Sequence, residues 1–223
     1  MTVDGSVVSC RQCGAEVPGG AVCGCGRLQP FPAGIDHWAV LGLRRGLRLE
    51  RGDLERRFHE LNRRFHPDYY RLRGPEEQAI SLENSAAVNA AYRTLRDPVS
   101  RVEYLLEVEG LALGTSGQAR PPADLFEEIM ELQEARQALE MAGGEAAEPL
   151  RARLAAAREE LEARRQATEG ELLALFPPWD LAAEAERRRL LGRMRDILAT
   201  RAYLRTVLRD LGTTLETVGG RME

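Results

Sequence analysis

Apolar side chains recur along most of this chain at the spacing of an α-helix. In residues 53–65 they stand three or four positions apart, which places them on one face of a helix; they are Leu54, Phe58, Leu61 and Phe65. Leu, Ala, Glu and Arg dominate the composition, and all four favour helices. The pattern therefore predicts an all-α fold, with helices at residues 36–42, 53–65, 76–96, 98–109, 122–141, 146–176 and 180–211.

The helices predicted at 53–65 and 76–96 are long enough to pack against each other as an antiparallel pair. We expect Asp53 to cap the first of them, because its side-chain oxygen can accept from an early backbone N–H. The second helix should bury a stripe formed by Leu82, Ser85, Val88, Tyr92 and Leu95. The short connection between the two helices would then lie at the exposed tip of a helical hairpin.

That connection contains the triplet His66-Pro67-Asp68. Pro67 cannot continue a helix and moves His66 out of helical geometry, so the triplet follows a helix end. A His near an Asp can be a general base with the group that orients it. However, no Ser or Cys lies beside it and the proline ring separates the two side chains. A docking site for another protein and a plain helix-ending turn are the other two interpretations.

The pattern of the last part of the chain predicts a bundle of helices. A stretch of linker composition, residues 114–121, precedes long helical patterns that are interrupted at Gly143-Gly144 and Pro177-Pro178. Leucines recur at helical spacing in the two longest patterns, as they do in the core of a helix bundle. We therefore predict a three-helix bundle in residues 122–216.

The first helix of this bundle has more apolar residues than one buried face requires. Phe126 and Met130 fall beside the main stripe, and acidic residues that include Glu131 and Glu134 flank them. A narrow apolar strip edged with carboxylates fits a partner that has an apolar centre and a basic rim. The alternative is that Phe126 and Met130 simply widen the core-facing stripe.

All four cysteines lie in the first 33 residues, as the close pairs Cys10 and Cys13, and Cys23 and Cys25. Four thiolates in two close pairs suit a tetrahedral Zn²⁺ ion, and this segment has few apolar residues with which to build a core. We expect a structural zinc knuckle. Two disulfides, a redox dithiol and an iron–sulfur cluster are the alternatives.

The overall composition excludes several classes of protein. The chain is 43% hydrophobic and 30% charged with a net charge of −4, which argues against a surface built for nucleic acid. No apolar run approaches the roughly 20 residues that span a bilayer, and the first residues resemble neither a signal peptide nor a transit peptide. We therefore expect a cytoplasmic protein with no nucleic-acid or membrane partner.

The motifs around the triplet resemble the J-domain of DnaJ-type co-chaperones. DHWAVLGL, LERRFHELNRRFHPD and NAAYRTLRDPVSRVEY stand in the order of that family. The resemblance implies that His66, Pro67 and Asp68 dock on a DnaK-class chaperone and trigger its ATP hydrolysis, with no chemistry in this chain. The helix before the triplet carries arginines that would steer it to an acidic surface, namely Arg56, Arg57, Arg63 and Arg64.

After this block the sequence resembles HscB, the J-type co-chaperone of iron–sulfur cluster assembly. RVEYLLEVEG replaces the usual R-x-x-Y-D, and a long acidic helix follows. The resemblance implies that the bundle holds an IscU-type scaffold protein, through Phe126, Met130, Glu131, Glu134 and Tyr203. VCGCGRLQP is similar to the second half of the four-cysteine module of eukaryotic HscB-like proteins.

The sequence thus predicts three parts with distinct roles: a zinc module at 1–33, a J-domain at 34–113 and a scaffold-binding bundle at 122–216. The chain would bring an IscU-type scaffold to a DnaK- or HscA-class ATPase and would not itself be an enzyme. One alternative is a general J-domain protein whose bundle holds another client. Another is a metal-dependent regulator or enzyme that uses the four-cysteine site.

Overall fold

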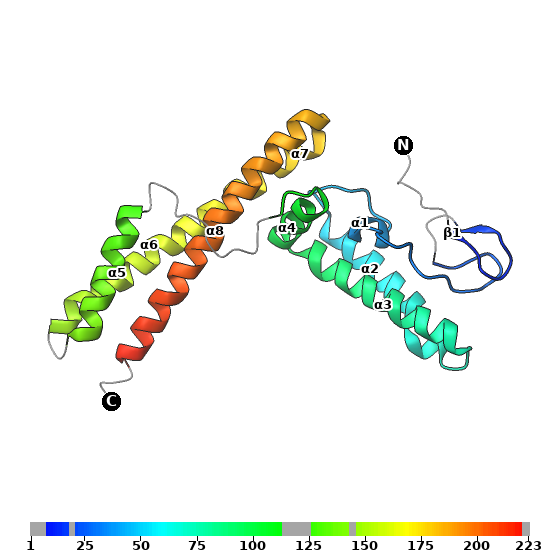
Figure 1. Ribbon diagram of the computed structural model, residues 1–223, viewed down its shortest axis with the longest axis horizontal. Helices are drawn as coiled ribbons and strands as arrows, with labels where there is room; N and C mark the ends of the chain where they lie inside the picture. Colours follow the sequence, from blue (N-terminus) through cyan, green and yellow to red (C-terminus); the bar gives the residue numbers. More distant parts are fainter. Residues whose placement is uncertain (1–7, 18–20, 113–125, 143–145, 220–223) are drawn as a thin grey trace. The chain divides into compact units, whose positions relative to one another are not determined.

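The computed structural model describes residues 8–17, 21–112, 126–142 and 146–219. These residues are mostly helical, which confirms the predicted all-α class (Figure 1). The chain divides into two compact units, Met1–Val108 and Glu109–Glu223, which are described separately below.

The first unit contains a short strand pair and a group of helices. Antiparallel strands β1 (Val8–Ser9) and β2 (Glu16–Val17) belong to the cysteine-rich segment. The helical elements that follow are α1 (His37–Val40), α2 (Arg51–Phe65), the one-turn 3-10 helix η1 (Pro67–Tyr70), α3 (Pro75–Arg96) and α4 (Pro98–Val108).

Helices α2 and α3 form the predicted hairpin and lie side by side (Figure 1). Leu54 and Phe65 of α2 are buried, and Ser81 Oγ donates to the Phe65 carbonyl at 2.8 Å. The predicted stripe on α3 was wrong at Leu82, which is 63% exposed. The buried face of α3 is wider than a two-helix contact requires, because α1 and the segment after the cysteines also pack on it; its members are Glu77, Ile80, Ser81, Asn84, Ser85, Val88, Ala91 and Leu95.

The start of α2 also differs from the prediction. Glu50 is the N-cap residue, and Asp53 lies inside the first turn. There its carboxylate accepts from the guanidinium groups of Arg56 and Arg57. Asp53 therefore acts as an acidic residue near the positive end of the helix dipole rather than as the cap.

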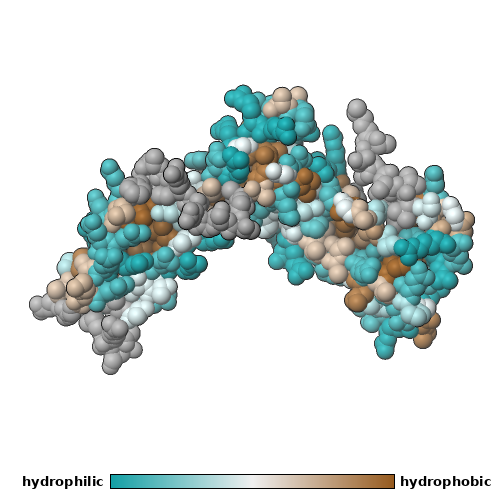
Figure 2. Space-filling model, viewed as in Figure 1, coloured by the Kyte–Doolittle hydropathy of each residue, from teal (hydrophilic) through white to brown (hydrophobic). Residues whose placement is uncertain are grey.

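The second unit contains α5 (Phe126–Met141), α6 (Ala147–Ala174), α7 (Phe176–Leu181) and α8 (Glu184–Gly219). Helices α5, α6 and α8 share one core and confirm the predicted bundle; its buried residues are Ile129, Leu132, Ala135, Leu139, Ala147, Leu154, Leu161, Leu204 and Leu211. Hydrophilic side chains cover most of the visible face of each unit, with small apolar patches between them (Figure 2).

The bend between α6 and α8 is more structured than the sequence indicated. Pro177 and Pro178 interrupt the long helices but lie in the first turn of α7, where a missing N–H costs nothing. The last long helix begins at Glu184 instead of residue 180 and continues to Gly219, beyond the predicted end at 211. In the described part of the chain, no helix combines the length and apolar character that crossing a bilayer requires.

Candidate functional site

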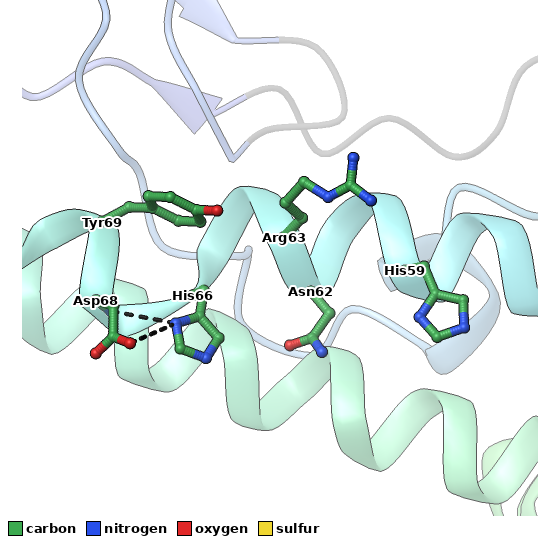
Figure 3. A pocket seen from close by; sticks show the side chains of 6 residues that line it. All are labelled: His59, Asn62, Arg63, His66, Asp68 and Tyr69. Carbon is green, nitrogen blue, oxygen red and sulfur yellow. Dashed lines mark hydrogen bonds and ion pairs between the residues drawn. The ribbon is translucent and has the colours of Figure 1, made fainter.

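The turn after α2 has the geometry that its proline dictates. His66 adopts an extended backbone (φ −62°, ψ 127°), and Pro67 begins η1. The Nδ1 atom of His66 accepts from the Asp68 backbone N–H at 3.3 Å and lies 3.6 Å from its Oδ2 (Figure 3). The side chains of His66 and Asp68 are 48% and 71% exposed, so both are available to a partner.

An open depression of about 450 Å³ lies beside this turn; it is lined by His59, Asn62, Arg63, His66, Asp68 and Tyr69. His59, Asn62 and His66 project from the same side of α2, while Arg63 and Tyr69 project to another side (Figure 3). These lining residues, all within the described part of the chain, include no serine, threonine or cysteine. The lining of the depression is polar and charged throughout.

Sequence reasoning missed three of these lining residues, His59, Asn62 and Tyr69. His59 and Asn62 precede His66 by seven and four positions, the spacing that repeats one face of a helix, so that signal was present. Tyr69 carried no comparable signal, because its 64% exposure depends on the path of the turn.

The four arginines predicted for docking differ in their surroundings. Arg63 and Arg64 are exposed near the turn. Arg56 is also exposed but contacts Asp53. Arg57 is only 37% exposed in its side chain, and its Nη1 donates to the Gly42 carbonyl at 2.8 Å. Arg57 therefore connects α2 to the loop after α1, in addition to any role on the surface.

The residues predicted to contact the scaffold lie on α5 and α8. Met130, Glu131 and Glu134 are exposed, and Glu131 forms an ion pair with Arg153 of α6 at 2.9 Å. The side chain of Phe126 lies outside the described residues. Tyr203 is half-buried against the bundle core, and this burial raises the pKa of its hydroxyl.

The structure brings the four predicted metal ligands together. The sulfurs of Cys10, Cys13, Cys23 and Cys25 all lie within 4.8 Å of one another. The Cys10–Cys25 and Cys13–Cys23 separations are 3.7 Å and 3.5 Å, and no disulfide joins them. Sulfurs that bind one tetrahedral zinc ion at the usual bond length lie about 3.8 Å apart. The arrangement therefore fits a single metal ion.

Glycines allow the two tight turns around these sulfurs. Gly14 (φ 73°) donates its N–H to the Cys10 carbonyl at 2.9 Å, and Gly26 (φ 82°) donates to the Cys23 carbonyl at 2.9 Å. The second turn is one residue shorter, which accommodates the single residue between Cys23 and Cys25. The unusual C-x-C spacing is thus compatible with the cage.

In the absence of a cation, the pKa values of Cys10 and Cys23 shift in opposite directions. Backbone N–H groups of Cys13 and Gln12 lower the pKa of Cys10 to about 6. The Cys25 backbone N–H lowers the pKa of Cys23, but burial and the neighbouring thiols together outweigh this effect. The net result is a pKa raised to about 12. A divalent cation among the sulfurs favours the thiolate at every position.

Comparison with known proteins supports the resemblance seen in the motifs. No family model matches the chain. Two curated proteins described as co-chaperone protein HscB homologues, from Aliivibrio fischeri strains MJ11 and ATCC 700601 / ES114, are each 35% identical over 106 residues, 47% of this chain. The chain spans 61% of the length of these relatives.

Solved structures extend the likeness to most of the fold. The crystal structure of human co-chaperone protein HscB matches with a TM-score of 0.66 and 25% identity, covering 92% of this chain and 98% of the human one. Chaperone HscB from Vibrio cholerae matches with a TM-score of 0.51 and 22% identity, covering 85% and 100%. The resemblance to HscB-type co-chaperones that the sequence indicated is confirmed.

Proposed function

We propose that this chain is a J-type co-chaperone of iron–sulfur cluster assembly that stimulates a DnaK/HscA-class ATPase. The observation that carries the proposal is the exposed His66-Pro67-Asp68 turn at the end of α2, next to the polar depression described above. Pro67 fixes the backbone, so docking orders little additional chain. Among the described residues, the ion-pair distance of Asp68 is to His66 and no arginine pairs with it, so its carboxylate suits a charge-assisted contact with a basic group of the chaperone.

The C-terminal bundle would bring an IscU-type scaffold to the same chaperone. Simultaneous binding of both partners raises their local concentration, and this requires no chemistry in the chain itself. A general J-domain protein would share the docking turn but not the client, so scaffold binding separates the two candidates. A regulator that used only the cysteines would not depend on His66.

The scaffold surface can be tested with exchanges on the exposed side of α5. The double variant Met130→Ser/Glu134→Ala should bind an IscU-type scaffold about tenfold or more weakly, because it removes an apolar anchor and an acidic rim group. Stability should change by less than about 0.5 kcal/mol, since both side chains are exposed. Isothermal titration of the full chain measures the affinity.

A matched control lies at the other end of the same helix. Met141→Ser/Glu140→Ala makes the same chemical changes at exposed positions of α5 and should leave the affinity unchanged. Equal loss in both double variants, or in neither, would show that the client contacts a different surface.

We also propose that the four cysteines hold structural zinc. Cys10, Cys13, Cys23 and Cys25 supply the donor set, and the sulfur separations fit one ion. Purified full-length protein should contain one zinc per chain by elemental analysis, and Cys23→Ser should reduce the zinc content sharply, because a structural site uses every ligand. Brown protein with iron and sulfide in place of zinc would instead identify a cluster.

A further inference from the structure

The segment that follows the second cysteine pair is fixed along helix α3. Arg27 Nη1 forms an ion pair with Glu77 at 3.0 Å, and the Leu28 backbone N–H donates to Glu77 Oε1 at 3.4 Å. Two turns further along the same face of α3, Asn84 Nδ2 donates to the Gln29 carbonyl at 2.9 Å. Glu77 and Asn84 are 4% and 1% exposed. Buried polar groups cost free energy unless they are paired, so α3 depends on this segment for its partners.

Gln29 connects the same segment to the sulfur cage. Its Nε2 donates to Cys10 Sγ at 3.5 Å, and its Oε1 accepts from the Arg11 backbone N–H at 3.3 Å. The side chain is thus held by the first cysteine pair while the carbonyl is held by α3, and the residue is only 2% exposed. Donors behind a metal ligand fix its orientation, and the bond is stronger when the sulfur is a metal-bound thiolate.

The segment ends directly behind the docking turn. The Phe31 backbone N–H donates to Asn84 Oδ1 at 3.1 Å, and the Phe31 ring meets the Phe65 ring edge-on at a centroid distance of 5.5 Å. Phe65 is 1% exposed and immediately precedes His66. A continuous set of contacts therefore leads from Cys10 through Gln29, Asn84 and Phe31 to the last turn of α2.

We propose that metal binding at the four cysteines stabilises the docking turn through this set of contacts. Gln29, Phe31 and Asn84 are positioning residues: they touch neither the metal nor a partner, but they transmit the closure of the cage to the end of α2. The coupling within the chain stands on the contacts above, whereas its consequence for the chaperone rests on the proposed function. Without the metal, the two cysteine pairs are joined by hydrogen bonds such as those of Gln29 with Cys10 and Arg11 instead of by four metal–sulfur bonds, and residues 27–31 leave α3 more often.

Hydrogen exchange measured by mass spectrometry on the full chain tests this coupling, with one equivalent of Zn²⁺ and after removal of the metal by a chelator. Metal removal should accelerate exchange about tenfold in the last turn of α2, η1 and the first half of α3, as expected when a few hydrogen bonds open locally. Exchange in α4 and in the second unit should not change.

Asn84→Ala should show the accelerated exchange even with zinc bound, and removal of the metal should add little to it. Asn89→Ala is the matched control, because Asn89 Nδ2 donates to the Ser85 carbonyl within α3 itself at 2.8 Å. It should retain the full response to zinc. Gln29→Met serves as a second variant that keeps the backbone contact with Asn84, and it should weaken zinc binding about tenfold or more.

Equal exchange of the wild-type turn with and without zinc would overturn the coupling, as would a uniform acceleration that includes α4. ATPase stimulation, measured in parallel, separates this inference from the proposed function. Zinc-dependent exchange without stimulation of any DnaK-class chaperone would leave the coupling intact and remove the chaperone role. Stimulation that is unaffected by zinc, together with unchanged exchange, would leave the chaperone role and remove the coupling.

Discussion

The His66→Gln variant is expected to lose the stimulation of a DnaK/HscA-class ATPase and to keep its fold. The imidazole is 48% exposed, and it contacts Asp68, two residues away, and the Tyr69 ring in a T-shaped arrangement. Its removal should therefore change the free energy of unfolding by less than about 0.5 kcal/mol. Stimulation should fall at least about tenfold, because a central residue of a small docking surface supplies much of its binding energy. Steady-state ATP hydrolysis over a titration of co-chaperone, from below the half-maximal concentration of the unaltered chain up to saturation, measures the effect.

The matched control is His59→Gln, the same exchange two helical turns earlier. His59 is exposed and lines the same depression, but it lies away from the turn. We expect this variant to keep full stimulation at saturation and to require at most a few-fold more protein for half-maximal effect. If His66→Gln stimulates hydrolysis as well as the unaltered chain does, the proposed docking role of the turn is wrong.

The features that sequence predicted best depend on local rules. The spacing of Leu54, Phe58, Leu61 and Phe65 predicted the inward face of α2, on which Leu54 and Phe65 are buried and the other two are half-buried. Pro67 ends that helix wherever the rest of the chain lies. Cysteine spacing likewise predicted the sulfur cage, because four thiols within a short loop have few ways to meet. The location of the exposed turn followed from the apolar spacing of α2 and from Pro67.

The features that sequence did not predict depend on partners far along the chain. Asn84 is buried because residues 27–31, more than 50 positions earlier, pack on its face of α3, whereas Leu82 points away from that face and is exposed. Helical periodicity cannot distinguish these two faces when both carry apolar and small residues. Arg57 likewise resembles a solvated arginine until its contact with Gly42 is known.

The most consequential of these unpredicted features is Arg101, which is 6% exposed. From the first turns of α4, its Nε donates at 2.8 Å to the carbonyl of Leu95 in the last turn of α3, and its Nη1 donates to the carbonyl of Leu47. The guanidinium thus carries positive charge to the negative end of the α3 dipole. It also joins three segments of the first unit with one side chain, which a lysine cannot do with the same geometry.

Arg101→Met should therefore destabilise the first unit by about 3 kcal/mol, because it leaves buried carbonyls without their charged donor. For a unit of this size the loss corresponds to a Tm lower by more than about 10 °C. Arg101→Lys should be intermediate. The chain has two tryptophans, Trp38 in the first unit and Trp179 in the second. Fluorescence in a Trp179→Phe background therefore reports the unfolding of the first unit through Trp38 alone.

Arg93→Met in the same background is the comparison for Arg101→Met. Arg93 is exposed on α3, and its Nε donates to the Asn89 carbonyl of the same helix at 3.3 Å. Its loss should cost less than about 0.5 kcal/mol, as is usual for an exposed position. Equal unfolding temperatures for the two variants would mean that the contacts of Arg101 add no net stability. A large difference would show that the packing of the α2–α3 hairpin in the first unit depends on a buried arginine whose acceptors are backbone carbonyls in two other segments.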